Sequence, residues 1–553
     1  MSDTARQRKI SRTIFRVFTK LHGLHMQTDA TAYLEEQLLT EKESDIVEIL
    51  EKYVTAYKKK YSDRGVVIVD KASLKDIVTS LQIPETAADD PTPFQRAEDE
   101  INDSLQDMSL NETETVDVSK HFTVVNAFDM PRFQYDVERK GFVKSVTAGT
   151  AGELSLLASA NEKADMFRDR FNLVKQRLLR NENFCPSSMD LLKKDSYMKI
   201  TPIMSLIGRD GGRFLLFGML TQIEDGKLFL EDEDAHIELD VSQCKYGPGL
   251  FTDNTFVLVE GQYRADRVFQ ADEIGFPPAE RRELSDTLFS HVDFTGLPKS
   301  TVDENVLKFE EAAHKGISIV TISDVWLDQP RVMNALRGIF EGYESSSIPL
   351  AFILLGDFTS LHFVEPRQYR DNFTILADLI AEFPALATHS YFVFVPGARD
   401  PWGNNTLPQA PIPDLFVARI KQKVRRAIFT TNPCRIRYCT QDIVVFRDDI
   451  LSRLWRNTLL SPREDEEEDR RKHGHLCPLP LSARPTYWAF DHALRLYPLP
   501  QAVILADQCD NYGITYEGTH CMNPGSFPNS QFSWSVYYPA LKTSERCALP
   551  TAP

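Results

Sequence analysis

Three short apolar segments of this 553-residue chain each lead into an aspartate that could take part in chemistry. The segments are 317–322, 351–355 and 391–395, and the acids that follow them are Asp324, Asp357 and Asp400. In α/β proteins, ligands bind at the carboxyl ends of the strands. Carboxylates gathered there could hold divalent ions that activate water and stabilise phosphoryl oxygens.

The order of these acids resembles the calcineurin-like metallophosphoesterases, which use the motifs D-x-H, G-D-x-x-D, G-N-H-D/E and a later G-H-x-H. Most of the ligands are missing here. Trp326 stands for the first His and Ser360 for the second carboxylate, while Ala398 and Arg399 stand for the Asn and the next His. Tryptophan cannot ligate a hard divalent ion, and Arg399 puts a fixed positive charge where a cation would lie.

We therefore expect no catalytic residue, no metal and no cofactor at these positions. The remaining carboxylates make a weak magnesium site at best, and we interpret them as acids that bond loops or helix ends. One adventitious divalent ion, and a metal role for His473 and His475, stay open as minor alternatives. The resemblance makes these motif positions vestigial: Asp324, Trp326, Asp357, Ser360, Ala398, Arg399 and Asp400.

The elements around these acids alternate between strands and helices, which predicts an α/β domain, and the resemblance implies an inactive calcineurin-like phosphoesterase domain over 291–553. Continuous apolar strands between amphipathic helices indicate a sheet buried on both faces. Later elements are a hairpin of 435–438 with 443–446, a strand at 502–506 and a last strand at 532–538. The acidic run 463–472 predicts a solvated loop.

A second domain, expected over 195–290, contains short apolar segments typical of strands. Five of them fit a small OB-fold β-barrel: 203–208, 214–222, 227–232, 236–241 and 255–263. Residues 195–275 carry 7 Lys and Arg against 15 Asp and Glu. Barrels that bind single-stranded DNA need a basic groove with stacking aromatics, so we favour a barrel that docks protein.

The first part of the chain predicts a different organisation. Apolar residues at helical spacing indicate a small helical domain over 1–81. An acidic, proline-containing stretch at 82–118 holds 11 acids and one base, which predicts a flexible linker. Residues 119–194 are predicted to form a wrapping segment that connects to the barrel. The fold class is therefore multidomain α+β.

Overall composition limits the function classes. The chain has 63 Lys and Arg against 80 Asp and Glu, a formal net charge of −17, and such a surface repels nucleic-acid backbones and anionic membranes. Eight cysteines show no C-x2-C pair, which disfavours a zinc ribbon. No apolar run reaches the roughly 20 residues that a membrane helix needs.

A barrel followed by a phosphoesterase domain without its ligands resembles the B subunits of the replicative DNA polymerases. Segments similar to that family stand at 126–133, 219–232, 356–366, 428–450, 476–481, 494–500 and 523–527. Residues 1–81 match more loosely, as a lid-like domain akin to small AAA+ C-terminal domains. The resemblance implies a non-catalytic accessory subunit of a nuclear DNA replication complex.

The resemblance also implies partners. The barrel and phosphoesterase domains would hold the C-terminal zinc-bearing domain of the polymerase's catalytic subunit, and residues 1–81 would contact the GINS part of the replicative helicase. Small histone-fold subunits would be bound indirectly, and DNA weakly or through the complex, with no membrane contact. The alternatives are an active metallophosphoesterase or nuclease, and a single-strand DNA-binding OB protein.

Overall fold

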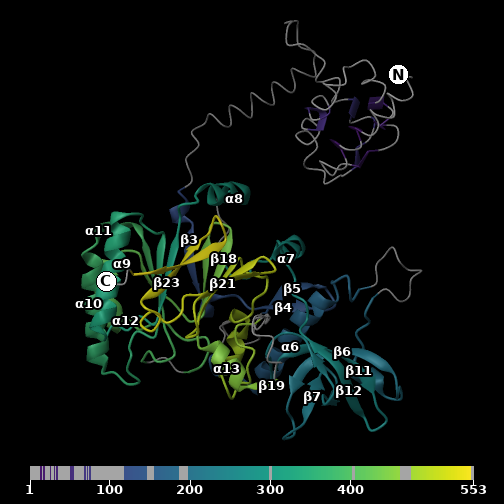
Figure 1. The fold of residues 1–553 in the computed structure, drawn as a ribbon. Coiled ribbons are helices and arrows are strands. Elements are labelled where there is room, and N and C mark those ends of the chain that lie inside the picture. Colours follow the sequence, from purple (N-terminus) through teal and green to yellow (C-terminus); the bar gives the residue numbers. More distant parts are fainter. Residues whose placement is uncertain are drawn as a thin grey trace. The chain divides into compact units, whose positions relative to one another are not determined.

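The computed structural model describes residues 117–145, 155–185, 197–297, 302–401, 405–460 and 475–549, with scattered positions between 13 and 75. It divides the chain into two compact units, Met1–Thr113 and Glu114–Pro553. Figure 1 shows the elements of both units. Within the described residues, no helix combines the length and the apolar character needed to cross a bilayer.

The first unit buries the apolar residues that set the predicted helical pattern. Fully buried among them are Ile14, Phe18, Leu34, Leu50, Val54 and Leu74. One feature differs from the expectation of helices alone, because β1 (His25–Met26) and β2 (Ile68–Val69) pair in parallel. The linker expected at 82–118 lies outside the described residues up to residue 116, so both its extent and the boundary at 81 stay predictions.

In the second unit, the first of two large sheets carries the three strand-end acids. Its strand order is β16-β15-β14-β13-β23-β24. β13 to β16 run parallel to one another. β23 runs antiparallel to β13, and β24 runs antiparallel to β23. The strands are β13 (Ile319–Ser323), β14 (Ala351–Leu355), β15 (Tyr391–Val395), β16 (Ala427–Phe429), β23 (Ser533–Tyr538) and β24 (Thr543–Ala548). The expectation that 532–538 would be the last strand is wrong, because β24 extends the sheet beyond it.

The second sheet has the order β21-β22-β20-β18-β17-β3. Its strands are β3 (Phe122–Asn126), β17 (Cys434–Tyr438), β18 (Gln441–Arg447), β20 (Ala502–Ala506), β21 (Tyr512–Tyr516) and β22 (Thr519–Asn523). The predicted hairpin is confirmed as the antiparallel pair β17–β18. The expectation of one sheet is wrong, because an apolar strand pattern shows that both faces are covered without showing whether helices or a second sheet cover them.

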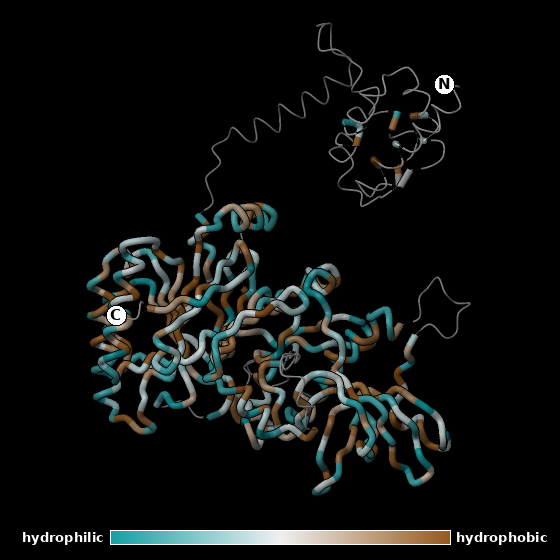
Figure 2. Tube along the Cα trace, in the orientation of Figure 1, coloured by the Kyte–Doolittle hydropathy of each residue, from teal (hydrophilic) through white to brown (hydrophobic). Residues whose placement is uncertain are grey.

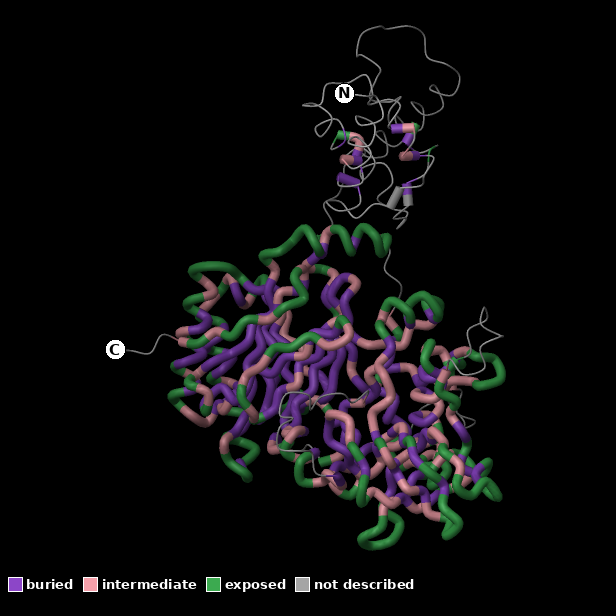
Figure 3. The backbone as a smooth tube through the Cα atoms, turned by 45° about the vertical axis from the view of Figure 1, so that its right-hand side comes forward, coloured by how far each residue is buried: buried purple, intermediate pink, exposed green. Residues whose placement is uncertain are grey.

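The two sheets pack face to face, and helices cover the outer face of the first sheet (Figures 1 and 3). Alternation along β14 sends Phe352 and Leu354 toward the helices, and Ile353 and Leu355 toward the second sheet. The helices are α9 (Pro330–Ser345), α10 (Pro366–Ala381), α11 (Pro384–His389) and α12 (Asp414–Lys423). Figure 2 shows the apolar residues concentrated along these layers.

The strands of the barrel lie within the predicted range 195–290, but one predicted strand is not a strand, and another segment supplies the fifth. The segment 203–208, expected as a strand, begins with the 3-10 helix η5 (Ile203–Leu206), and Ile203 and Leu206 are buried three residues apart. The fifth long strand is instead β12, which pairs with both β11 and β8 and so closes the barrel. The barrel strands are β6 (Arg213–Thr221), β7 (Leu228–Glu231), β8 (His236–Asp240), β9 (Lys245–Tyr246), β11 (Phe256–Tyr263) and β12 (Val268–Gly275).

Residues 119–194 contribute to both modules rather than to a separate one. β3 joins the second sheet by pairing with β17, and β4 (Phe133–Asp136) forms a hairpin with β5 (Gly141–Lys144). The long helix α6 (Ala160–Leu178) packs on the barrel, where the Phe171 and Phe217 ring centroids lie 5.0 Å apart.

Several short elements complete the second unit. β10 pairs with β19 and so joins a barrel loop to the sandwich. These elements are η3 (Val118–Lys120), η4 (Ala127–Asp129), β10 (Phe251–Thr252), α7 (Arg282–Phe289), α8 (Glu304–Ala313), α13 (Ile450–Arg456), β19 (Thr458–Leu460) and η6 (Trp488–Ala493).

The close approach of β11 and β12 can be tested at Gly261, where the register of their pairing shifts. A Cβ at Gly261 would lie 2.0 Å from the backbone oxygen of Gln270. Gly261→Ala is therefore expected to lower the free energy of unfolding by about 1–3 kcal/mol, as overpacking does. Gly275→Ala in the partner strand is the control, because its Cβ meets nothing within 4 Å. Equal stabilities of the two variants in urea denaturation would contradict this account.

Candidate functional site

The structure brings the three predicted acids together at the carboxyl ends of β13, β14 and β15. Asp324, Asp357 and Asp400 follow these strands in turn, and they are 1%, 2% and 3% exposed. Asp324 has a φ of +58°, a left-handed conformation that aspartate adopts more readily than most residues. The backbone N–H of Asp357 lies 3.4 Å from Oδ1 of Asp324, so the first two strand ends are in contact.

A guanidinium group lies between the first two acids. Nη2 of Arg447 is 2.7 Å from Oδ1 of Asp324 and 3.8 Å from Oδ2 of Asp357. Its Nε donates to the backbone oxygen of Gly356 at 2.7 Å, and its Nη1 donates to Oδ1 of Asp449 at 2.9 Å and to the Ala506 oxygen at 3.1 Å. The side chain is 3% exposed. Arg447 therefore joins the strand ends of both sheets.

Arg399 supplies a second positive charge to this place. Its backbone N–H donates to Oδ1 of Asp357 at 2.8 Å, and its Nε lies 3.2 Å from Oδ2. Burial raises the pKa of Asp357, whereas Arg447 and the hydrogen bond from Arg399 oppose that rise. Both oxygens of Asp357 thus face arginine donors.

Asp400 is engaged by the loops around it. Its Oδ1 accepts hydrogen bonds from the Phe358 backbone at 2.8 Å and from the Tyr369 hydroxyl at 3.1 Å. Its Oδ2 accepts from the Gly397 backbone at 2.7 Å. Burial, together with the nearby charge of Asp357, raises the pKa of Asp400 to about 7. Because both oxygens have donors, this carboxyl acts as a connector between loops.

The other predicted positions contribute no metal ligand. Trp326 is half-buried and packs against the apolar core between sheet and helices. Ser360 hydrogen-bonds Asp328 through both its backbone N–H and its hydroxyl, and Ala398 is exposed. The arrangement therefore does not fit the two-metal centre that the phosphoesterase resemblance implies, since fixed guanidinium groups lie beside Asp324 and Asp357. No cluster of three or more His, Cys, Asp or Glu in the described residues could hold a metal ion.

His475 lies apart from this site. Its Nε2 is 3.5 Å from Oδ1 of Asp491, and its Nδ1 accepts a hydrogen bond from the Cys477 backbone at 3.0 Å. Burial and the nearby Arg170 lower the pKa of His475. His473, its companion in the sequence, lies outside the described residues.

Sequence reasoning missed Arg447, although a signal was present. The residue directly follows the apolar run 443–446, and β18 runs parallel to β20. Side chains at the carboxyl ends of such strands are those that reach a ligand site. The predicted site residues were chosen as possible metal ligands, so the arginine at the end of this strand was not included.

The barrel was the other candidate site, and some of its basic residues pair with its own acids. Lys227 lies within 3.3 Å of both Glu224 and Glu238, and Arg264 lies within 3.1 Å of both Asp240 and Asp266. Two of its aromatic rings pack under α6, where Phe217 and Phe256 contact Phe171. These paired charges and packed rings are therefore not free to bind a single strand, which needs a basic groove with stacking rings.

The described residues thus combine an OB-type barrel with a two-sheet sandwich in which Arg447 lies beside two of the strand-end acids, and family comparisons match this combination to the B subunits of DNA polymerases. The family model for the B subunits of DNA polymerases alpha and epsilon matches residues 319–513. A second model, "DNA polymerase epsilon subunit 2-like, OB-fold domain", matches residues 160–278.

Curated relatives specify the member of this class. The chain is 35% identical to "DNA polymerase epsilon subunit 2" of Bos taurus, covering 95% of this chain and 96% of the relative. It is 30% identical to the protein of the same name from Drosophila melanogaster, covering 96% of each. The chain therefore belongs to the DNA polymerase epsilon subunit 2 family.

Among solved structures, the chain is similar to one titled "Structural and Functional Characterization of a Novel Archaeal Phosphodiesterase". That match has 14% identity and a TM-score of 0.25, and it covers 42% of this chain and 100% of the other. Likeness of this degree carries no argument about activity.

The Arg447 arrangement predicts a large cost when the guanidinium is removed. Arg447→Met leaves Asp324 and Asp357 without their shared buried cation, and breaking such a pair costs about 3–5 kcal/mol of unfolding free energy. The double variant Arg447→Met with Asp324→Asn is expected to recover part of this loss. Arg337→Met, which breaks the exposed pair with Glu382, is the control and should cost about 0–1 kcal/mol. A loss no larger than the control's in denaturant unfolding would refute the role of Arg447.

Proposed function

We propose that this chain is a non-catalytic scaffold subunit of DNA polymerase epsilon, which acts in the nucleus by holding the catalytic subunit and the replicative helicase together. The observation that carries the proposal is the Arg447 guanidinium beside Asp324 and Asp357. A fold that would otherwise gather metal ions at this place holds a fixed positive charge instead. The membership of the family gives the complex in which such a subunit serves DNA replication.

In this proposal, two units of the chain bind different partners. The barrel and the sandwich, which α6 and the β10–β19 pairing join, hold the C-terminal zinc-bearing domain of the catalytic subunit. The N-terminal unit contacts GINS in the helicase. Binding through a linker raises the effective concentration of one partner near the other without new contacts between them. Small histone-fold subunits join indirectly, and DNA is reached through the complex.

The first prediction from this proposal concerns catalysis. The purified chain is expected to turn over neither a generic phosphodiester nor DNA when manganese is added, because Arg447 and Arg399 stand beside the carboxylates that would bind metal. The measurement is product formation over several hours, with an active metallophosphoesterase as the positive control. Activity that disappears in Asp357→Asn would overturn the non-catalytic assignment.

The second prediction concerns the division between the two surfaces. Deletion of residues 1–81 is expected to abolish co-purification with GINS while the catalytic subunit stays attached, because the two contacts use separate units of the chain. Circular dichroism of the shortened chain is the control for folding of the remainder. Loss of both partners together, or of neither, would show that the division of labour is wrong.

A further inference from the structure

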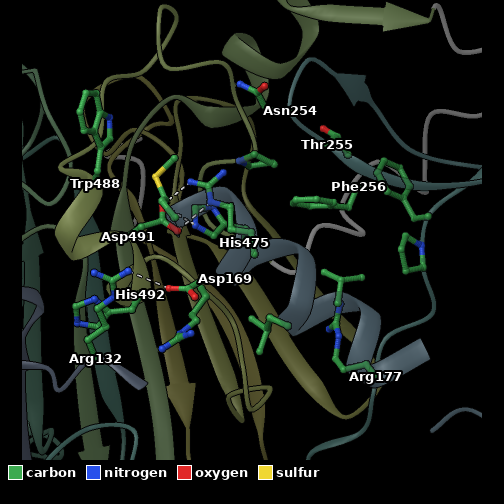
Figure 4. Close-up of a pocket in the computed structure, with 18 residues that line it drawn as sticks. Arg132, Asp169, Arg177, Asn254, Thr255, Phe256, His475, Trp488, Asp491 and His492 are labelled. Carbon is green, nitrogen blue, oxygen red and sulfur yellow. Dashed lines mark hydrogen bonds and ion pairs between the residues drawn. The ribbon is translucent and has the colours of Figure 1, made fainter. Parts of the chain in front are cut away.

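A cavity of about 90 Å³ lies between the barrel and the sandwich, away from the strand-end site. One face of α6 lines it with Met166, Arg170, Leu173 and Arg177, which are spaced at helical intervals. The opposite walls come from barrel strand β11 and from η6 (Figure 4). Four arginines in all line the cavity, against two aspartates.

Two of the arginines have carboxylate partners. Arg170 forms a paired contact with Asp491, in which its Nε donates to Oδ2 at 2.9 Å. Nη1 of Arg132 lies 2.6 Å from Oε2 of Glu162, and its Nη2 lies 3.0 Å from Oδ2 of Asp169. These charges are therefore compensated inside the protein, as buried charges require.

Arg177 has no such partner. It is 9% exposed, its Nε makes no hydrogen bond, and it forms no ion pair with any described residue. The nearby acid Glu280 is already engaged by Arg180 at 2.6 Å and by the Ser285 and Tyr497 hydroxyls. Figure 4 places Arg177 on the side of Phe256, away from Asp491. A buried guanidinium without a counter-charge carries a large desolvation cost.

Apolar side chains form part of the cavity wall. Leu173 and Val174 come from α6, and Phe256, Phe276 and Pro277 come from the barrel side. Apolar walls exclude water and strengthen any charge pairing made between them. A planar guanidinium also presents paired donors that match the two oxygens of a carboxylate or phosphate group.

We propose that this cavity binds an oxyanion, a carboxylate or phosphate group, through Arg177. The group accepts hydrogen bonds from the guanidinium and supplies the direct ion-pair partner that no described residue provides. Its source is either a free anion or an acidic group of a partner protein. The second source rests on the proposed function, whereas the first does not.

The test of the site uses the full chain and thermal unfolding in a buffer of low anion content. Inorganic phosphate and acetate are titrated separately, and each binding anion is expected to raise the unfolding temperature saturably. Arg177→Met should weaken the apparent affinity by about 10- to 100-fold, the range for lost hydrogen bonds to a charged group. Without added anion, the same variant should be at least as stable as the wild type, because it removes an uncompensated buried charge.

Matched variants separate the site from general salt effects. Arg168→Met lies on the exposed side of α6, where Arg168 pairs with Asp165, and it should keep the full response. Arg177→Lys retains the charge and should keep a weakened response, and it serves if the Met variant does not fold. An equal response of the wild type and Arg177→Met would overturn the proposal.

A second arm identifies the source of the anion with the chain assembled on the polymerase catalytic subunit. If a partner's acidic group occupies the cavity, phosphate should no longer shift unfolding in the complex, and Arg177→Met should weaken the complex. If the ligand is a free anion, the phosphate response should persist and the complex should be unaffected. The proposal fails if the chain alone responds to neither anion and Arg177→Met leaves the complex intact. Failure of the scaffold function would appear instead as loss of the complex with the wild-type chain.

Discussion

The buried guanidinium of Arg447 is the interaction on which the central part of this protein depends. It contacts Asp324 at the end of β13, Gly356 at the end of β14 and Ala506 at the end of β20. It therefore connects the two sheets at the edge where their strands end. Strand ends that carry buried carboxylates repel one another unless a cation lies between them. Here a side chain of the chain itself, Arg447, provides that cation.

Because Arg447 occupies this position, the strand-end acids are better placed to bond other parts of the protein than to support metal-assisted hydrolysis. Metal-assisted hydrolysis needs open coordination positions that water and substrate can enter. Arg447 donates its hydrogen bonds to the protein, and Asp400 accepts three from the loops around it. Groups that are engaged in this way stabilise one conformation and leave little free for a substrate. These contacts connect the strand ends and the loops around them within the sandwich.

The helix α6 connects the barrel to the sandwich, because it contacts both modules. Phe171 packs against the barrel ring Phe217, while Arg170 one residue earlier pairs with Asp491 of η6. One helix thus uses an apolar contact on one side and a buried ion pair on the other. This arrangement fixes the barrel to the sandwich, and the cavity at Arg177 lies along the same helix face. A group bound there would touch the junction of the two modules.

The sequence by itself determined the central strands of the sandwich and the identity of the acids. The ranges 351–355, 391–395 and 502–506 were correct because each is a short, continuous apolar run. The missing ligands at Trp326 and Ser360 were equally visible, since side-chain chemistry does not depend on the fold. Only the tertiary structure decided that a second sheet covers the first, that 268–275 closes the barrel, and that Arg447 reaches Asp324 across 123 positions of chain. Burial patterns show that a face is covered but not by which distant segment, because that choice depends on contacts between residues far apart in the sequence.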